Sequence, residues 1–310
     1  MSMLFDSVIP SVAPVFLIIF IGYLIGRKTN YDLQFVTDIT MYFSLPALIF
    51  SSLAQKWDTP FQTKEFVITG SGTVFIILGS ALLATIYFQW TKHRDFEKLY
   101  PTIMFISSGN FVLSLDYFAF GYDGFLRGVF FQMVNTSLMF TLGVYLVGRE
   151  TNVRKIFQIP FFYAATAGVL IWVLHIKLPD FILHGVDFMG KAALPMLLLL
   201  LGYSLKNIQI ANMSLALTGG LFRIFGGLCI ATVFVIVLRS TGLIGTSEQE
   251  ILTLKLLIFN GSMPAAVATL LLAQKYDQRP DLVASSVFAS TVIGLTTIPI
   301  ILWSVNYFFD

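Results

Sequence analysis

The sequence predicts an all-α membrane protein with ten transmembrane helices. Of its 310 residues, 56% are hydrophobic and only 12% are charged, whereas roughly a quarter of the residues in a soluble domain are charged. Apolar stretches of about 20 residues, which suffice for a helix to cross the hydrocarbon core of a bilayer, recur along the whole chain. The alternating strand pattern of an outer-membrane barrel is missing from the sequence, so we expect a bundle of helices.

Charged residues, prolines and glycines divide the chain into ten apolar runs. The first five spans are expected near residues 8–26, 37–54, 66–90, 101–118 and 125–148. The second five are expected near residues 159–178, 187–205, 213–238, 251–273 and 282–307. All connections between them are short, so no soluble domain is predicted.

Basic residues are distributed unevenly between the two ends of these spans. Lys and Arg near helix ends are retained in the cytoplasm, so the richer side is predicted to be cytoplasmic. It carries Arg27, Lys28, Lys92, Arg94, Lys98, Arg149, Arg154, Lys155, Lys206, Lys275 and Arg279. The opposite side has fewer, among them Lys64, Arg127 and Lys191. We therefore expect a multi-pass protein of the cell membrane with both termini outside.

Several functional classes are disfavoured by the same sequence. A net charge of +2 without a basic cluster argues against a nucleic-acid partner. The single cysteine, Cys229, excludes an intrachain disulfide and a cysteine-rich metal site. No metalloprotease, phosphate-loop or nucleophile-elbow motif occurs, so we predict neither an enzyme nor a bound cofactor.

The two halves of the chain, residues 1–150 and 151–310, resemble each other. Asp38 and Leu45-Pro46 in the second span match Asp187 and Leu194-Pro195 in the seventh, at an offset of 149 residues. Asn110 and Ser114 in the fourth span match Asn260 and Pro264 in the ninth at an offset of 150. Because each half holds five spans, the two copies are expected to be inverted repeats, which are common in secondary transporters.

The fourth and ninth spans are predicted to be broken helices that cross. Pro264 removes a backbone donor, and the small polar residues around both positions lower the cost of unwinding. Broken helices expose N–H groups with partial positive charge, so an anion is the expected guest. The candidate binding residues are Ser107, Ser108, Gly109, Asn110, Asn260, Ser262, Met263 and Pro264, with Ser114 and Pro264 as the helix breakers. The alternative is that these polar groups only join neighbouring helices.

Two charged residues are expected within the membrane. Arg223 lies well inside the eighth span and Asp116 near the end of the fourth. An intramembrane charge suggests a function and requires a partner, so the two could pair, or Asp116 could carry a coupling proton. Alternatively, Asp116 lies at the outer mouth and Arg223 extends to the interface. Lys191 is interpreted as an interfacial anchor.

At these residues the chain resembles the auxin efflux carrier family, in its short-loop prokaryotic form. The similarity runs through essentially all ten spans. It is carried by Tyr42-Phe-Ser-Leu-Pro-Ala-Leu-Ile-Phe50, Ser108-Gly-Asn-Phe111, Ala119-Phe-Gly121, Met139-Phe-Thr-Leu-Gly-Val-Tyr145, Pro264-Ala-Ala266, Ala273-Gln-Lys-Tyr276 and Ala284-Ser-Ser286.

The resemblance implies a scaffold made of spans 1, 2, 6 and 7 and a moving transport domain made of spans 3–5 and 8–10. It places Asn110 and Pro264 at the positions where the broken helices cross, and it allows a homodimer. Leu45 and Pro46 are candidate substrate-binding residues. Alternatively, Pro46 only kinks a helix of the scaffold. The sequence departs from the family where Val112 and Ser114 replace the usual Gly and Pro, which weakens the predicted break in the fourth span.

Together these observations predict a secondary transporter of a small organic anion that works by alternating access. The resemblance suggests carboxylates such as indole-acetate, malate or malonate, with either H⁺ or Na⁺ as the coupling ion. A ligand-sensing receptor or a channel on the same fold remains the alternative at this stage.

Overall fold

The computed structural model describes residues 9–54, 63–91, 94–107, 112–148, 160–174, 176–204 and 212–309. Within these ranges the regular structure is helical, and the only extended pairing is one isolated bridge. In the first half the α-helices are α1 (Ile9–Lys28), α2 (Gln34–Ile39), α3 (Leu45–Ala54), α4 (Thr63–Thr91), α5 (Tyr100–Met104), α6 (Val112–Leu138) and α7 (Val144–Gly148). In the second half they are α8 (Pro160–Val173), α9 (Asp180–Lys191), α10 (Ala193–Ser204), α11 (Met213–Leu221), α12 (Gly227–Ser240), α13 (Glu248–Gly261), α14 (Ala268–Lys275) and α15 (Pro280–Phe309).

Helical segments overlap every span predicted from the sequence. Five of them are long and apolar enough to cross a bilayer: Lys64–Thr91, Val112–Val147, Asp180–Tyr203, Met213–Ser240 and Pro280–Phe309. The protein is therefore an all-helical, multi-pass membrane protein. That ten segments cross the membrane as inverted repeats stays a prediction.

Local irregularities lie where the sequence places helix-disrupting residues. A π-helical turn, Thr40–Ser44, joins α2 to α3 just before Pro46, and Ala192 separates α9 from α10 just before Pro195. Gly121 adopts φ 66° and ψ −159°, so the backbone turns sharply within the range of α6. This turn separates the ranges predicted for the fourth and fifth spans.

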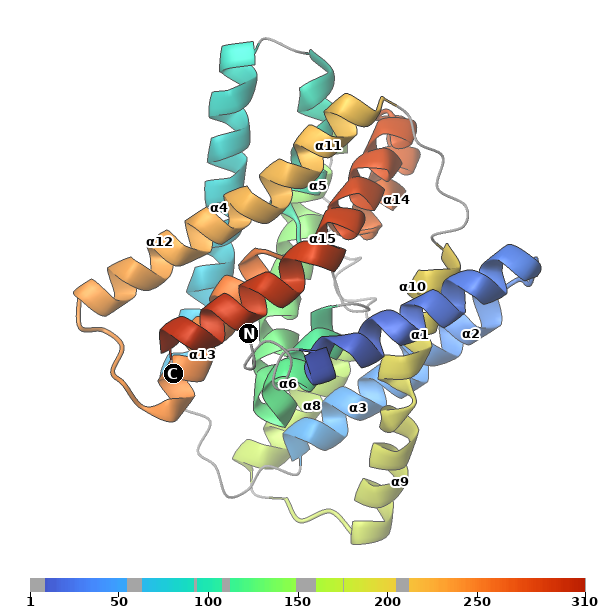
Figure 1. Cartoon of the computed structure of the whole chain (residues 1–310). Coiled ribbons are helices and arrows are strands. Elements are labelled where there is room, and N and C mark those ends of the chain that lie inside the picture. The colour runs from blue at the N-terminus through green and yellow to red at the C-terminus, as the bar shows by residue number, and fades with distance from the viewer. Residues whose placement is uncertain are drawn as a thin grey trace.

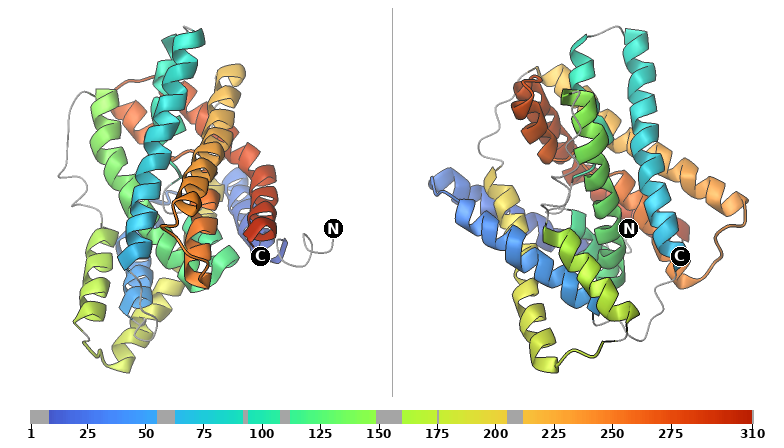
Figure 2. Two further views of the ribbon diagram at one scale, coloured as in Figure 1. Left: turned by 90° about the vertical axis from the view of Figure 1, so that its left-hand side faces the viewer. Right: turned by 180° about the vertical axis from the view of Figure 1, so that it is seen from behind.

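The helices pack in two groups, which lie on different sides of the molecule in Figure 1 and in the right-hand view of Figure 2. In the first group α1 packs along α10, and α3 packs on α8 and α9. In the second group α4 packs on α6 and α12, α13 lies among these three, and α11 packs along α15. The groups meet at α6, where Leu113 and Phe125 share a buried cluster with Leu48 of α3 and Leu197 of α10.

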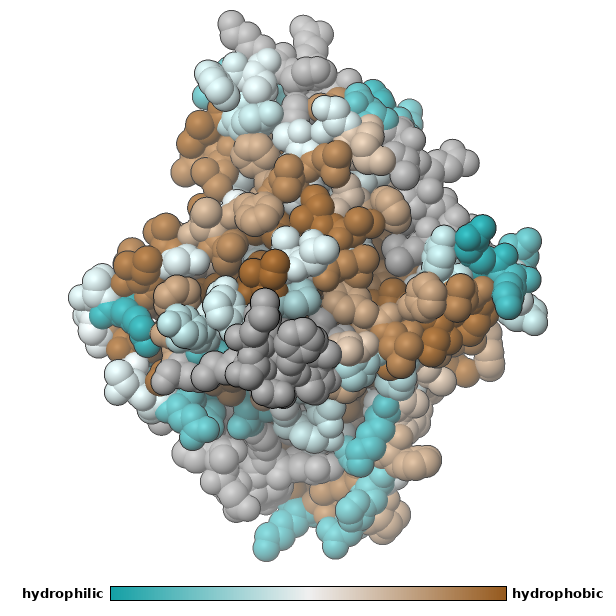
Figure 3. Space-filling model, viewed as in Figure 1, coloured by the Kyte–Doolittle hydropathy of each residue, from teal (hydrophilic) through white to brown (hydrophobic). Residues whose placement is uncertain are grey.

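The outer surface is largely apolar. Large hydrophobic side chains such as Trp90, Phe188 and Phe308 are more than 70% exposed. Figure 3 shows hydrophobic residues across the middle of one face and hydrophilic ones mostly towards its edges. Exposed apolar patches of this extent are rare on soluble monomers and are expected of a surface that contacts lipid.

Candidate functional site

Two helices of the second group are interrupted in the protein interior. α5 ends at Met104, after which Phe105 is extended (φ −97°, ψ 132°), and helical structure resumes with α6 at Val112. α13 ends at Gly261, and α14 begins at Ala268 after a non-helical segment that contains Pro264. Both interruptions coincide with the breaks predicted from the sequence.

The two interruptions are paired with each other. Ile106 and Ala265 form an antiparallel bridge. The amide of Ser107 donates to the carbonyl of Pro264 over 2.8 Å, and the amide of Ala266 donates to the carbonyl of Phe105 over 3.1 Å. Unpaired backbone groups are costly away from water. Each interruption therefore supplies partners that the other needs.

Two side chains complete this pairing from either side. Asn135 of α6 donates from Nδ2 to the Ile106 carbonyl over 2.9 Å, and its Oδ1 accepts from the Ile106 amide over 3.2 Å. On the other strand, Ser290 Oγ of α15 accepts from the Ala265 amide over 3.1 Å. Sequence reasoning missed both residues, although an Asn in the middle of an apolar run was a usable signal.

Arg223 binds the backbone of both interruptions. It lies in the π-helical turn Phe222–Gly226 between α11 and α12, and it is completely buried. Its Nη1 donates to the carbonyls of Ile103 over 2.7 Å and Met104 over 3.1 Å. Its Nε donates to the Met263 carbonyl over 3.2 Å, and its Nη2 donates to the Gly261 carbonyl.

Asp116 is held by Asn260 and not by Arg223. Asp116 is completely buried, and its Oδ2 accepts from Asn260 Nδ2 over 3.1 Å. The second carboxylate oxygen of Asp116 and the amide oxygen of Asn260 have no hydrogen-bond partner among the described residues. The structure therefore does not bring the charges of Asp116 and Arg223 together as an ion pair. Both side chains are buried in the protein interior.

The remaining predicted site residues fall in different places. Ser107, Ser262 and Met263 lie in the interruptions and are buried, and Ser114 is buried on α6. Ser262 Oγ donates to the carbonyl of Phe259, so its hydroxyl proton is engaged within its own segment. Ser108, Gly109 and Asn110 lie outside the described residues. Leu45 and Pro46 belong to α3, in the other packing group.

Asn260 and its predicted counterpart Asn110 differ in where they stand along the chain relative to the ends of α13 and α5. α13 ends 157 residues after α5, and α14 begins 156 residues after α6. The offset of 150 residues used to match Asn110 with Asn260 therefore does not superimpose the two interruptions. Asn260 lies in the last turn of α13, before the interruption, whereas Asn110 follows the end of α5.

A small cavity of about 180 Å³ lies between the two packing groups. From α6 it is lined by Tyr117, Phe118 and Tyr122, which follow Asp116 in the chain. The first group contributes Ile18, Leu48, Lys191, Leu194 and Pro195. Lys191 is 62% exposed and lies 2.7 Å from Asp187. Sequence reasoning interpreted this lysine as an anchor, but it brings a positive charge to the edge of the cavity.

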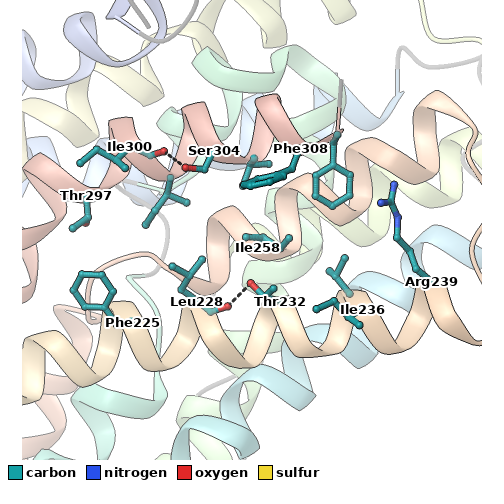
Figure 4. Close-up of a pocket in the computed structure, with 14 residues that line it drawn as sticks. Phe225, Leu228, Thr232, Ile236, Arg239, Ile258, Thr297, Ile300, Ser304 and Phe308 are labelled. Carbon is teal, nitrogen blue, oxygen red and sulfur yellow. Dashed lines mark hydrogen bonds between the residues drawn. The ribbon is translucent and has the colours of Figure 1, made fainter. Parts of the chain in front are cut away.

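A larger cavity, of about 650 Å³, lies away from the interruptions between α12, α13 and α15 (Figure 4). Its walls are mostly apolar, and its hydroxyl groups are used within their own helices: Thr232 donates to the Leu228 carbonyl and Ser304 to the Ile300 carbonyl. The guanidinium of Arg239 lies 4.6 Å from the ring centroid of Phe309. This cavity offers few polar groups that could select a substrate.

A buried ion pair and its polar neighbours link the starts of α4 and α13 to the middle of α6. Arg127 of α6 pairs with Glu65 of α4, and the two side chains are 2% and 3% exposed. Arg127 also donates to Thr253 Oγ1 over 2.9 Å and to Gln249 Oε1 over 2.8 Å, both on α13. Sequence reasoning counted Arg127 as a loop residue. It is buried because Glu65 and the polar groups of α13 compensate its charge.

Comparison with known proteins points to membrane transport. The sequence profile of a family described as membrane transport proteins matches residues 143–302. An uncharacterized transporter of Methanothermobacter thermautotrophicus is 26% identical over 98% of this chain and 99% of its own length. An uncharacterized transporter of Methanocaldococcus jannaschii is 24% identical over 93% of this chain and 96% of its own length.

Proposed function

Because the chain belongs to the family of membrane transport proteins, the auxin efflux carriers, we propose that it is a secondary transporter of a small organic anion. The observation that carries this proposal is the pair of interrupted helices held against each other in the interior. In secondary transporters, broken helices of this kind form the substrate site near the middle of the membrane. The relatives are named as transporters, and neither they nor the family point to an enzyme.

The chemistry of the interruptions favours an anion. α6 and α14 both begin after an interruption, and the first N–H groups of a helix have no partner within it. At α14 the amides of Thr269 and Leu270 donate to the carbonyls of Ala266 and Val267 in the preceding turn, so the start of α6 is the better candidate. They also carry partial positive charge, which attracts a carboxylate. We propose that the N–H groups at the start of α6, together with Asn110, bind the substrate carboxylate, and that Gly109, Met263 and Pro264 leave room for it.

Asn260 was predicted from the sequence to bind the substrate directly, and we propose a different role for it. Its Nδ2 donates to Asp116, so in this arrangement it holds a buried carboxyl group. A substrate carboxylate would have to compete with Asp116 for the same amide. We propose that Asp116 and Asn260 link substrate binding to a coupling proton, which would bind at Asp116.

The cavity between the packing groups is proposed as the path by which the substrate reaches this site. Tyr117 and Tyr122 offer aromatic rings and hydroxyl groups, and Lys191 offers a cation to an organic anion. The group formed by α1–α3 and α8–α10, with Leu45 and Pro46, would be the scaffold. The helices around α4–α6 and α11–α15 would then move against it and expose the site to each side in turn.

A ligand screen tests this proposal on the purified protein. Ligands that bind only the folded state raise its thermal stability. We expect malate, malonate or indole-acetate, tested across pH, to stabilise the wild-type protein and Asn260→Ala to weaken the effect. Ser304→Ala, which changes a partly exposed side chain remote from the interruptions, is the matched control. Absence of both stabilisation and saturable uptake for all carboxylates tested would contradict the proposal.

A further inference from the structure

The surroundings of Arg223 resemble a cation site built from backbone oxygens. Four hydrogen bonds from its guanidinium end on the carbonyls of Ile103, Met104, Gly261 and Met263. A guanidinium has five N–H donors, so most of its donors are used on the two interruptions. The side chain is completely buried and carries the charge into the meeting point of the two broken helices.

Three of the four bound oxygens belong to helix ends that carry partial negative charge. Ile103 and Met104 are the last residues of α5, and Gly261 is the last residue of α13. Carbonyls in the last turn of a helix lack an intrahelical partner and form the negative end of the helix dipole. In transporters with broken helices, such carbonyls and C-terminal ends are the groups that coordinate Na⁺.

A glycine on α12 allows the close packing around the guanidinium. A Cβ added at Gly227 would lie 2.0 Å from the Gly261 carbonyl oxygen and 2.2 Å from Arg223 Nη2. Only glycine leaves α12 close enough for this contact. Among the described residues no carboxylate forms an ion pair with Arg223. Its charge is therefore compensated by helix ends and backbone dipoles.

We propose that the Arg223 guanidinium is a permanent, tethered cation in the place that a coupling Na⁺ would need, so that the transport cycle does not use sodium. The claim that transport does not use sodium rests on the proposed function. The claim that Arg223 occupies a cation site does not. A side chain that cannot dissociate neutralises the two helix ends throughout the cycle. The same charge is thereby unavailable as a substrate-binding cation, because its donors point to the backbone.

Thermal stability in different salts tests the cation site without any substrate. The purified full-length protein is unfolded in detergent with NaCl, KCl or choline chloride at equal ionic strength. We expect the wild-type midpoint to be the same in all three salts. Arg223→Ala should have a lower midpoint, which NaCl or millimolar guanidinium raises saturably and choline does not, because small cations can occupy the vacated oxygens.

Two further variants keep the test decisive. Arg223→Lys retains the positive charge with fewer donors, so it should unfold earlier than the wild type but remain insensitive to sodium. Arg239→Ala changes an exposed arginine near the end of α12, the helix that follows the turn of Arg223, and should not create a sodium response.

A saturable stabilisation of the wild type or of Arg223→Lys by Na⁺ alone would overturn the proposal. So would a folded Arg223→Ala protein that responds equally to choline and sodium. Failure of the proposed function would be seen instead as an absence of carboxylate flux, which leaves these midpoints unchanged.

Discussion

Asn135 and Ser290 both form hydrogen bonds with the backbone of the paired interruptions. Asn135 uses both ends of its amide on Ile106, and Ser290 accepts from Ala265, so each strand of the bridge has its own side-chain partner. These groups lie where water does not replace a lost hydrogen bond. Their removal should therefore affect the stability of the fold more than an exposed substitution of the same kind.

Asn135→Ala leaves both the amide and the carbonyl of Ile106 without this partner, whereas Ser290→Ala leaves only the Ala265 amide. A buried group left unsatisfied costs about 1–3 kcal/mol. We expect Asn135→Ala to lower the unfolding midpoint more than Ser290→Ala does. Thermal unfolding in detergent measures the order, with Ser304→Ala as a neutral control. Equal midpoints for Asn135→Ala and the wild type would contradict the assigned contacts.

The position of Asp116 depends on a glycine beside it. A Cβ added at Gly128 would lie 2.0 Å from Asp116 Oδ2, the atom that accepts from Asn260. Gly128→Ala should displace the carboxyl group and reduce carboxylate transport to a similar extent as Asp116→Ala.

Gly70→Ala on α4 is the matched control, because the nearest side-chain atoms would be 3.9 Å from its added Cβ. Uptake into proteoliposomes measures the effect. If Gly128→Ala and Gly70→Ala transported equally well, the Asp116–Asn260 contact would have no part in transport.

At the scale of helices, close approach of backbones holds α1 against α10. A Cβ at Gly22 would lie 2.3 Å from the Leu199 carbonyl oxygen, and one at Gly202 would lie 2.0 Å from that of Ile19. Helix pairs in membranes gain stability from such small residues, which let their backbones approach. The two glycines therefore define the contact that anchors the first packing group.

Gly202→Ala should separate α1 from α10 and lower the unfolding midpoint, and Gly22→Ala should do the same. Gly185→Ala on α9 is the control, because nothing lies within 4 Å of its added Cβ. Thermal unfolding of the three variants is the measurement. A midpoint for Gly202→Ala as high as that of Gly185→Ala would show that the two helices do not approach as described.

The start of α13 carries a carboxylate whose pKa is strongly lowered. Glu250 accepts from Lys64 Nζ over 2.5 Å and from Ser247 Oγ over 2.8 Å. These bonds, with that to Lys64 the largest cause, lower its pKa from the ordinary 4.5 to about 2. The stabilisation they provide is complete above the ordinary pKa and is lost as the pH falls from 4.5 towards 2.

We therefore expect the unfolding midpoint of the wild type to fall more steeply than that of Glu250→Gln between pH 5 and about 2. Above pH 6 the difference between the two proteins should be constant. Unfolding scans across this pH range measure the slope. Parallel curves down to the lowest pH would show that Glu250 is not stabilised by its contacts in the folded state.

The sequence predicted the helical segments and the positions of both interruptions for physical reasons that are local. Pro264 and the small residues beside it cannot sustain a regular helix, and apolar length alone indicates membrane-spanning segments. It did not predict the partners. Asn135, Ser290 and Glu65 lie far along the chain from the groups they bind, and only tertiary packing brings them together. Arg223 likewise could not be assigned to backbone carbonyls, because a sequence suggests a carboxylate partner first.

At the scale of the whole molecule, the two packing groups meet at α6, where Tyr117 and Tyr122 line a small cavity between them. The group with the interruptions is held together by Arg223 in the interior and by the Arg127–Glu65 pair, which links the starts of α4 and α13 to the middle of α6. Because Arg223 and Arg127 each bind several helices, we expect this group to move as one body in the proposed transport cycle. This arrangement supports alternating access by motion of one group against the other.

Counterflow in proteoliposomes tests the central claim most directly. Vesicles loaded with an unlabelled carboxylate are diluted into a trace of the same labelled compound, and internal label is followed with time. A transporter is expected to accumulate label transiently above equilibrium, with equal rates in sodium and choline media and much slower rates in Asn110→Ala and Gly128→Ala. Label that only equilibrates through a current-carrying pore, or does not enter at all, would contradict the account.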